Sequence, residues 1–215
     1  MSLARYPYRL GLAGANQRAV ELATGEFILH LDGDDISVAG RVESQVAYLK
    51  ANPRCVAVGS RVATIGPYGE VGRAMDLPIG ADVRRNLTRS NVLVHSATAF
   101  RADSLAKVGG YDLDLEHMED YGLVLKLAML GPIANLGVLG ALYRLHGGQV
   151  SRKFRPRGHY VNVIMGRRRA LAQLLGIGFG QRFLNDVWYM SVQWGMFTKG
   201  RLLPLAPRLF RSASR

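Results

Sequence analysis

Three aspartates follow a short apolar run near the beginning of the sequence, in the order Asp32-Gly33-Asp34-Asp35. In an extended segment, residues i and i+2 point the same way, so the sequence predicts that the carboxylates of Asp32 and Asp34 converge. Two carboxylates held close repel each other unless a cation joins them, and Mg²⁺ or Mn²⁺ takes oxygen ligands and bridges to diphosphates. The pattern therefore indicates a divalent-metal site. The alternative is an acidic turn in which Asp35 caps the next helix.

A second acidic pair, Glu119 and Asp120, opens an apolar pattern with helical spacing. A carboxylate at a helix start can accept the proton of a hydroxyl group as that group attacks a carbon atom, which is general-base catalysis. Alternatively, both carboxylates only stabilise the positive end of the helix dipole. The residues alone leave both interpretations open.

Two histidines and one arginine are further candidates. His146 follows a strand-like segment and is a candidate ligand of the metal or the diphosphate, with a structural role as the alternative. For His95 the sequence favours packing or a hydrogen bond over contact with an acceptor molecule. Arg144 is a candidate partner of Glu119 or of a phosphate group, and a structural pair is the preferred interpretation.

Alternating helical and strand-like segments must position these groups. The apolar run Phe27–Leu31 predicts a strand buried on both faces, and α/β sheets place ligands at the carboxyl ends of such strands. The sequence predicts helices over 12–24, 42–49, 81–87, 102–108, 119–130, 160–175 and 182–197, and strands over 27–31, 55–65, 97–101 and 139–144. This alternation indicates an α/β layer structure.

The composition fits one globular core with a small appendage. The chain has 215 residues, of which 48% are hydrophobic and 20% charged, enough for one core rather than two full domains. Its single cysteine, Cys55, excludes an internal disulfide framework and is expected to be buried, which favours a cytoplasmic location. No apolar segment of a signal peptide follows the first arginines, and the most apolar stretch, 127–143, is broken by Gly131-Pro132.

The formal net charge of +12 at pH 7 lies mostly behind residue 150, in arginine-rich clusters at 152–157, 167–169 and 201–215. Nucleic acid, an anionic membrane surface and phosphorylated small molecules are candidate partners for such charge. Nucleic acid is the weaker candidate, because neither zinc-finger spacing nor an aromatic platform accompanies the charge. The inner face of the cell membrane stays a candidate, with the aromatic residues of 182–197 either touching it or packing on the sheet.

Several motifs, taken in order, resemble those of family 2 glycosyltransferases. In that family a Gly-x-x-x-Ala-x-Asn helix precedes Ala-x-Gly-Glu-aromatic, a strand and an Asp-x-Asp-Asp motif, and this chain has a similar series from Gly11 to Asp35. Further along, the family has a Gly-Gly-aromatic-Asp turn, a Glu-Asp-x-x-Leu motif and a Tyr-Arg-x-His segment. The corresponding residues here are Gly109-Gly110-Tyr111-Asp112, Glu119-Asp120-Tyr121-Gly122-Leu123 and Tyr143-Arg144-Leu145-His146.

The resemblance implies a GT-A fold, in which a Rossmann-like mixed sheet is flanked by helices. It implies inverting, metal-dependent transfer of a sugar from a nucleoside-diphosphate donor to a saccharide or lipid-linked acceptor, in polysaccharide biosynthesis at the cell envelope. Asp32 would lie near the donor ribose and the metal, and Asp34 would be the principal ligand of Mg²⁺ or Mn²⁺. Asp120 would be the catalytic base, beside Glu119.

The resemblance also assigns sides to the remaining candidates. Gly11 and Asn16 would lie on the nucleotide-sugar side and His146 near the metal. His95 and Arg144 would face the acceptor.

Finally, the resemblance implies that an amino-terminal portion is missing. The family opens with two βαβ-type units that bind the base and ribose, each of about 30 residues or more, whereas 31 residues precede Asp32. We therefore expect 1–150 to form a partial, amino-terminally truncated GT-A domain with an exposed sheet edge, and 151–215 to form a basic helical extension. A partner chain is then a candidate source of the missing half. The alternative function is a non-catalytic subunit that binds a sugar nucleotide or an acceptor.

Overall fold

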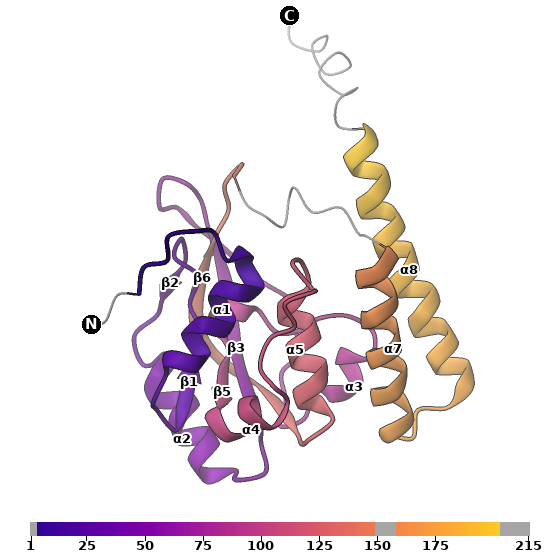
Figure 1. The fold of residues 1–215 in the computed structure, drawn as a ribbon, viewed down its shortest axis with the longest axis horizontal. Coiled ribbons are helices and arrows are strands. Elements are labelled where there is room, and N and C mark those ends of the chain that lie inside the picture. Colours follow the sequence, from indigo (N-terminus) through magenta and orange to yellow (C-terminus); the bar gives the residue numbers. More distant parts are fainter. Residues whose placement is uncertain (1–3, 149–157, 203–215) are drawn as a thin grey trace, which may run out of the picture.

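A mixed six-stranded sheet forms the centre of the molecule (Figure 1), in a computed structural model that describes residues 4–148 and 158–202. The strand order is β1 (Phe27–Leu29), β5 (Ala99–Arg101), β3 (Ala57–Ile65), β6 (Ile133–Arg144) and β2 (Ile36–Ser37), and β4 (Val71–Ala74) also pairs with β3. The long central strands β3 and β6 run parallel, and the other neighbours are antiparallel. The α/β class predicted from the sequence is confirmed.

Helices pack on both faces of this sheet. Successive residues of a strand point to opposite faces, and in β3 the side chain of Ala57 joins the hydrophobic cluster around α5 (Glu119–Ala128). The next side chain, Val58, joins a second cluster with Leu49 of α2 (Arg41–Ala51). Eight of the ten residues of α5 are buried, so α5 is a central helix, hydrophobic almost all round.

Two further helices lie beyond α5, side by side at one end of the molecule (Figure 1). These are α7 (Gly158–Leu174) and α8 (Phe179–Leu202). Tyr160, Ile164 and Leu171 of α7 belong to the same buried cluster as α5. The helical region is thus part of the main core. None of the helices in the described part of the chain combines the length and the apolarity that a membrane crossing requires.

The second arginine cluster of the sequence does not form a free basic surface. Arg167 pairs with Asp112, and Arg169 pairs with Asp186 at 2.7 Å. Between them, Arg168 is only 1% exposed. Helix packing thus engages all three arginines in pairs or hydrogen bonds within the protein, although 56% of the Arg169 side chain stays exposed. The side chains of the first and third clusters lie outside the described residues.

Most element positions agree with the sequence, including α1 (Gly11–Leu22) and α4 (Ala102–Lys107). β6 begins at Ile133, earlier than expected, and α3 (Arg84–Leu87) is a single turn. β2 and the 3-10 turn η1 (His95–Ala97) are not evident in the sequence. The prediction that the first strand is buried on both faces is wrong. β1 is half-buried, because it lies at the sheet edge with β5 beside it.

Candidate active site

Asp32 lies just beyond β1, where it is held from two sides. Its backbone N–H donates to Oγ of Ser96 at 3.1 Å, and that hydroxyl donates to Oδ2 of Asp32 at 2.8 Å. Nε2 of His30 lies 2.9 Å from Oδ1 of the same carboxylate. The hydrogen bond with His30 is the largest cause that lowers the pKa of Asp32 to about 2. Asp32 is therefore anionic across the physiological pH range.

A pair of histidine rings in contact, tilted by 36° to each other, extends this network. The rings of His30 and His95 lie 3.9 Å apart between centroids, and Nε2 of His95 is 2.7 Å from Oη of Tyr111. Burial lowers the pKa of His95 to about 3, so its ring is neutral. His95 is a packed and hydrogen-bonded residue, the role favoured by the sequence. Through Tyr111 it links the Asp32 site to the turn formed by 109–112.

A buried polar pair on α2 supports the same segment, and it was missed in the sequence. Arg41 donates from Nη2 to the carbonyl oxygen of His30 at 2.7 Å, and from Nε to Oε1 of Gln45 at 3.1 Å. Gln45 in turn donates to the carbonyl oxygen of Ala97 in η1 at 2.7 Å. The available signal was spacing: Arg41 and Gln45 share a helix face with the buried Leu49.

Asp34 has different partners from Asp32. Its Oδ2 lies 2.8 Å from Nε2 of His146, and its carbonyl oxygen accepts from Nε of Arg144 at 2.7 Å. Arg144 also donates to the carbonyl oxygen of Gly66 at 3.3 Å, which ties the acidic turn to the loop between β3 and β4. The structure thus brings Asp34, Arg144 and His146 together. Asp34 and His146 are candidate metal ligands, and Arg144 holds the backbone of the acidic turn.

Asp35 is not a helix cap. The helix that follows, α2, begins after Gly40 without a side-chain cap, and Asp35 directly precedes β2. Its Oδ1 accepts from the backbone N–H of Arg144 at 2.8 Å, which fixes β6 beside the acidic turn. Within the described part of the chain its buried Oδ2 has no hydrogen-bond partner, and burial raises the pKa of this carboxyl group.

The second acidic pair opens α5. Asp120 accepts from Nδ2 of Asn91 at 3.0 Å and from the backbone N–H of Tyr121 at 2.6 Å. The residue before the pair, Met118, has a φ of 73°, in the left-handed region that non-glycine residues seldom adopt. Its Sδ accepts a long hydrogen bond, 3.8 Å, from the hydroxyl of Tyr189 on α8. Such strained backbone is found where the surrounding structure dictates a side-chain direction.

Burial raises the pKa of both carboxyl groups of this pair. Glu119 is 5% exposed and its pKa rises to about 8, with the charge of Asp120 as a second cause. The pKa of Asp120 is also raised by burial, and the charge of Asp32 adds to the rise. Asp32 therefore lies close enough to influence Asp120. The acidic turn thus contributes to the electrostatic environment of Asp120, 88 residues further along the chain.

The two candidates on α1 are not placed in this cluster. Gly11 has a φ of 71° and lines a cavity of about 560 Å³ together with Gln17, Glu116 and Tyr160. Asn16 belongs to α1, and its buried Nδ2 has no hydrogen-bond partner among the described residues. Counted from Gly11, the amide of the family's Gly-x-x-x-Ala-x-Asn pattern falls on Gln17.

Gln17 has a structural role that the sequence does not reveal. Its Oε1 accepts from the backbone N–H of Tyr111 at 2.8 Å. A side chain at Gly110 would meet the same Oε1 at 2.1 Å, and Gly110 has a φ of 66°. The positive φ therefore explains the glycine at 110, and a larger residue would also displace the Gln17 side chain.

Solved structures of the GT-A type are similar to this fold. S. aureus TarS 1-349 in complex with UDP-GlcNAc matches with a TM-score of 0.59 and 14% identity, over 90% of this chain and 55% of that one. The mannosyltransferase PcManGT of Pyrobaculum calidifontis, in complex with GDP-Man and Mn²⁺, matches with a TM-score of 0.51 and 18% identity, over 95% and 56%. At these identities the likeness concerns the fold, which is α/β of the GT-A type.

The family follows from the sequence match. The model of glycosyl transferase family 2 matches residues 2–109, and the chain belongs to that family. The amylovoran biosynthesis glycosyltransferase AmsE of Erwinia amylovora is 33% identical over 129 residues, which are 59% of this chain and 48% of that protein. The chain spans about half the length of these relatives.

Proposed function

We propose that this chain carries out inverting transfer of a sugar from a nucleoside-diphosphate donor to a saccharide or lipid-linked acceptor, with Asp120 as base. One observation carries the proposal: the pKa values of two carboxyl groups of the candidate site are shifted in opposite directions. The pKa of Asp32 is lowered to about 2, whereas burial raises that of Asp120. Titratable neighbours whose pKa values are driven apart typically divide charge stabilisation and proton transfer between them.

In the proposed step, the acceptor oxygen forms a bond to the anomeric carbon, from the side opposite the diphosphate. The acceptor proton passes to the carboxylate of Asp120 as the bond from the anomeric carbon to the diphosphate oxygen breaks. The electron pair of that bond leaves with the nucleoside diphosphate. A raised pKa makes Asp120 a stronger base than an aspartate in water. Glu119, with a pKa of about 8, is mostly protonated at pH 7 and adds little competing charge.

The acidic turn fits a divalent cation shared with the donor. In the described residues, no group of three or more His, Cys, Asp or Glu side chains is arranged to hold a metal ion. Mg²⁺, however, is commonly held by one or two carboxylates together with substrate phosphates. Asp34 and His146, with 45% and 34% of their side chains exposed, would supply the protein ligands, and Asp32 would lie behind them. The cation would neutralise the charge that develops on the leaving diphosphate.

The donor and acceptor classes come from the relatives. The two solved neighbours bind UDP-GlcNAc and GDP-Man, and the sequence relative is named for amylovoran biosynthesis. We extend to this chain a nucleotide sugar as donor and an acceptor of polysaccharide biosynthesis. The arginine-rich composition of residues 151–215 supports a place at the inner face of the membrane. We also propose that β1, at the sheet edge, pairs with strands from an upstream segment or from a partner chain that hold the nucleoside base.

The proposal is tested by calorimetric titration of the chain with UDP and with GDP, in the presence and absence of Mn²⁺. Asp34→Ala should abolish the Mn²⁺-dependent part of the binding. Asp35→Asn is the matched control, because its amide oxygen can still accept from the N–H of Arg144. Undiminished Mn²⁺-dependent binding by the Asp34 variant would overturn the assignment of the donor side.

A further inference from the structure

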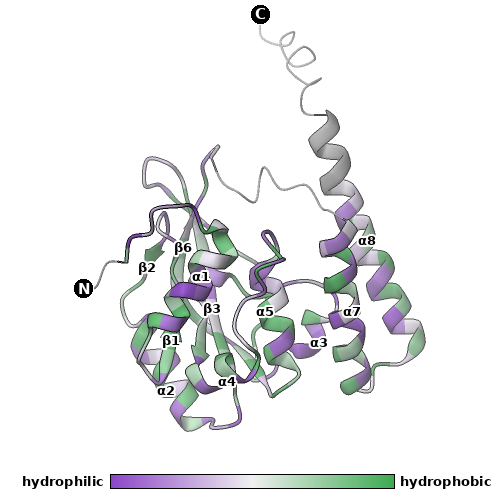
Figure 2. Ribbon diagram, in the orientation of Figure 1, coloured by the Kyte–Doolittle hydropathy of each residue, from purple (hydrophilic) through white to green (hydrophobic). Residues whose placement is uncertain are grey.

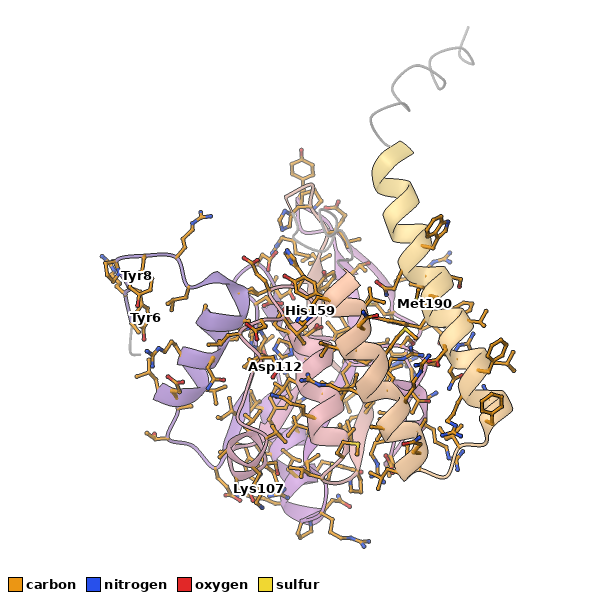
Figure 3. All side chains as sticks on the ribbon, turned by 45° about the vertical axis from the view of Figure 1, so that its right-hand side comes forward. Tyr6, Tyr8, Lys107, Asp112, His159 and Met190 are labelled. Atoms are coloured by element: carbon orange, nitrogen blue, oxygen red, sulfur yellow. The ribbon has the colours of Figure 1, made fainter. Side chains whose placement is uncertain are left out.

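The outer face of α8 is apolar, although α8 lies at the edge of the molecule. Figure 2 shows hydrophobic residues along this helix, and Figure 3 labels Met190 on it. Side chains spaced three or four residues apart share one side of a helix. Such a series, here called the α8 stripe, consists of exposed large side chains: Phe179, Phe183, Val187, Met190 and Trp194.

The inward face of α8 is the more polar one. Asn185, Tyr189 and Gln193 are buried against the rest of the protein. Asn185 donates to Oγ1 of Thr88 at 3.0 Å, and its carbonyl oxygen accepts from Arg168. A helix that only packs on its own domain has the opposite arrangement, with apolar residues inward and polar residues outward. An exposed apolar stripe of this length marks a contact surface.

The net charge of residues 151–215 indicates which kind of partner the α8 stripe contacts. Residues 151–215 hold 13 of the 28 Lys and Arg residues but 1 of the 16 Asp and Glu residues, so the whole net charge of +12 belongs to them. The single acid, Asp186, is paired with Arg169 at 2.7 Å. Apolar side chains with aromatic rings, in a segment rich in arginine and poor in acids, are typical of helices that lie in the interface of an anionic bilayer.

We infer that the α8 stripe docks the protein on an anionic lipid surface, with α8 lying in the plane of the interface. This inference deepens the proposed function, since a lipid-linked acceptor lies at such a surface. The binding itself requires neither donor nor acceptor. A vesicle experiment and a transfer experiment can therefore fail independently of each other.

The two tryptophans of the chain provide a reporter and its control. Trp194 belongs to the stripe, whereas Trp188 lies six positions away, roughly 120° around the helix, with the guanidinium of Arg89 4.2 Å from its ring centroid. Trp188→Phe leaves Trp194 as the only reporter, and Trp194→Phe leaves Trp188. On phosphatidylglycerol–phosphatidylcholine vesicles, the emission of Trp194 should shift to the blue and be quenched by brominated acyl chains. The emission of Trp188 should change much less.

Two valines of α8, one on the stripe and one off it, test whether the stripe is the face that contacts the membrane. Val187 on the stripe and Val192 off it are 50% and 40% exposed, and each can be changed to glutamate with the same change of charge. Val187→Glu should weaken vesicle partitioning on the order of tenfold, because the carboxylate must enter the apolar side of the interface. Val192→Glu should weaken vesicle partitioning by no more than about twofold, because only charge repulsion acts at this position.

Three outcomes would overturn the inference. The first is that the full chain does not bind anionic vesicles in low salt. The second is equal loss in both glutamate variants, which would reduce the effect to charge alone. The third is that the protein does not bind vesicles but forms a concentration-dependent dimer, which Val187→Glu abolishes. The stripe would then be a contact between two copies of the chain, measurable by analytical ultracentrifugation.

Discussion

Asn91 donates a hydrogen bond from Nδ2 to Oδ2 of Asp120 at 3.0 Å, across 29 residues of sequence. Oδ1 of the same amide accepts from the backbone N–H of Leu93 at 3.2 Å, which fixes its orientation. Asp120 is held by Tyr121 on its other oxygen. The proposed base is thus oriented from two directions, and Asn91 is a positioning residue for it.

Changing Asn91 should therefore alter the pH dependence of transfer. In Asn91→Asp, Oδ1 can still accept from Leu93, but a negative charge replaces the donor beside Asp120. This charge raises the pKa of Asp120, and the base is active only when deprotonated. The acidic limb of the profile of kcat/KM against pH should move to higher pH, with the KM for the donor little changed. A merely structural role would lower activity equally at all pH values.

Asp120→Asn should lower kcat by about a hundredfold or more, in the range usual for the loss of a general base. Binding of the nucleoside diphosphate should change little, because Asp120 is assigned to the acceptor proton rather than to the donor. Single-turnover rates together with donor titration separate these two effects. Near-full turnover in this variant would remove Asp120 from the mechanism, and His95 would be the next residue to examine.

Glu119 should make the folded protein less stable as the pH rises. Its pKa is about 8 when folded, against an ordinary value of 4.5, so the folded state binds this proton more tightly than the unfolded state. The stabilisation is complete below pH 4.5 and is lost as the pH rises through about 8. Glu119→Gln should be more stable than the unchanged protein at pH 8, by on the order of 2 kcal/mol. Urea unfolding at pH 5 and pH 8 measures this, and a gap that does not grow with pH would contradict it.

Two adjacent arginines should differ sharply in their effect on stability. Arg168 is 1% exposed and donates to the carbonyl oxygens of Thr88 and Asn185 at 2.7 and 2.8 Å. Arg168→Leu would remove these buried, charge-assisted hydrogen bonds and should lower the free energy of unfolding by about 3 kcal/mol. Arg169 has 56% of its side chain exposed in its pair with Asp186, so Arg169→Leu should cost less than about 1 kcal/mol. Equal losses in urea unfolding would refute the distinction.

The elements could be predicted from the sequence wherever a local signal was strong. The helical spacing of α5, the hairpin of β3 and β4 and the glycines of the 109–112 turn each leave such a signal, and the structure confirms them. β2 escaped prediction because its residues, Ile36 and Ser37, form a strand by pairing with β6, more than 100 residues away. The edge position of β1 likewise depends on which strand lies beside it. An apolar run alone does not reveal that.

The charged residues of the candidate site could be predicted from the sequence, but the residues that hold them in place could not. Asp32, Asp34 and Asp120 stand out by type and spacing, whereas Ser96 and Arg41 become meaningful only when the fold brings them to the Asp32 segment. The expected convergence of Asp32 and Asp34 took their segment to be extended. The chain turns at this point, with the N–H of Asp35 bonded to the carbonyl oxygen of Asp32 at 3.2 Å, so each carboxylate meets a different histidine.

The backbone conformation of Met118 affects both the stability of the protein and the orientation of the residues that open α5. It is the one non-glycine residue with a positive φ in the described part of the chain, a conformation that costs about 1–3 kcal/mol. Glycine at this position would relieve that strain. It would also let the backbone before Glu119 and Asp120 leave the orientation that it now has. Met118→Gly should therefore slow the proposed transfer, while the relief of strain offsets part of the packing that is lost with the methionine side chain.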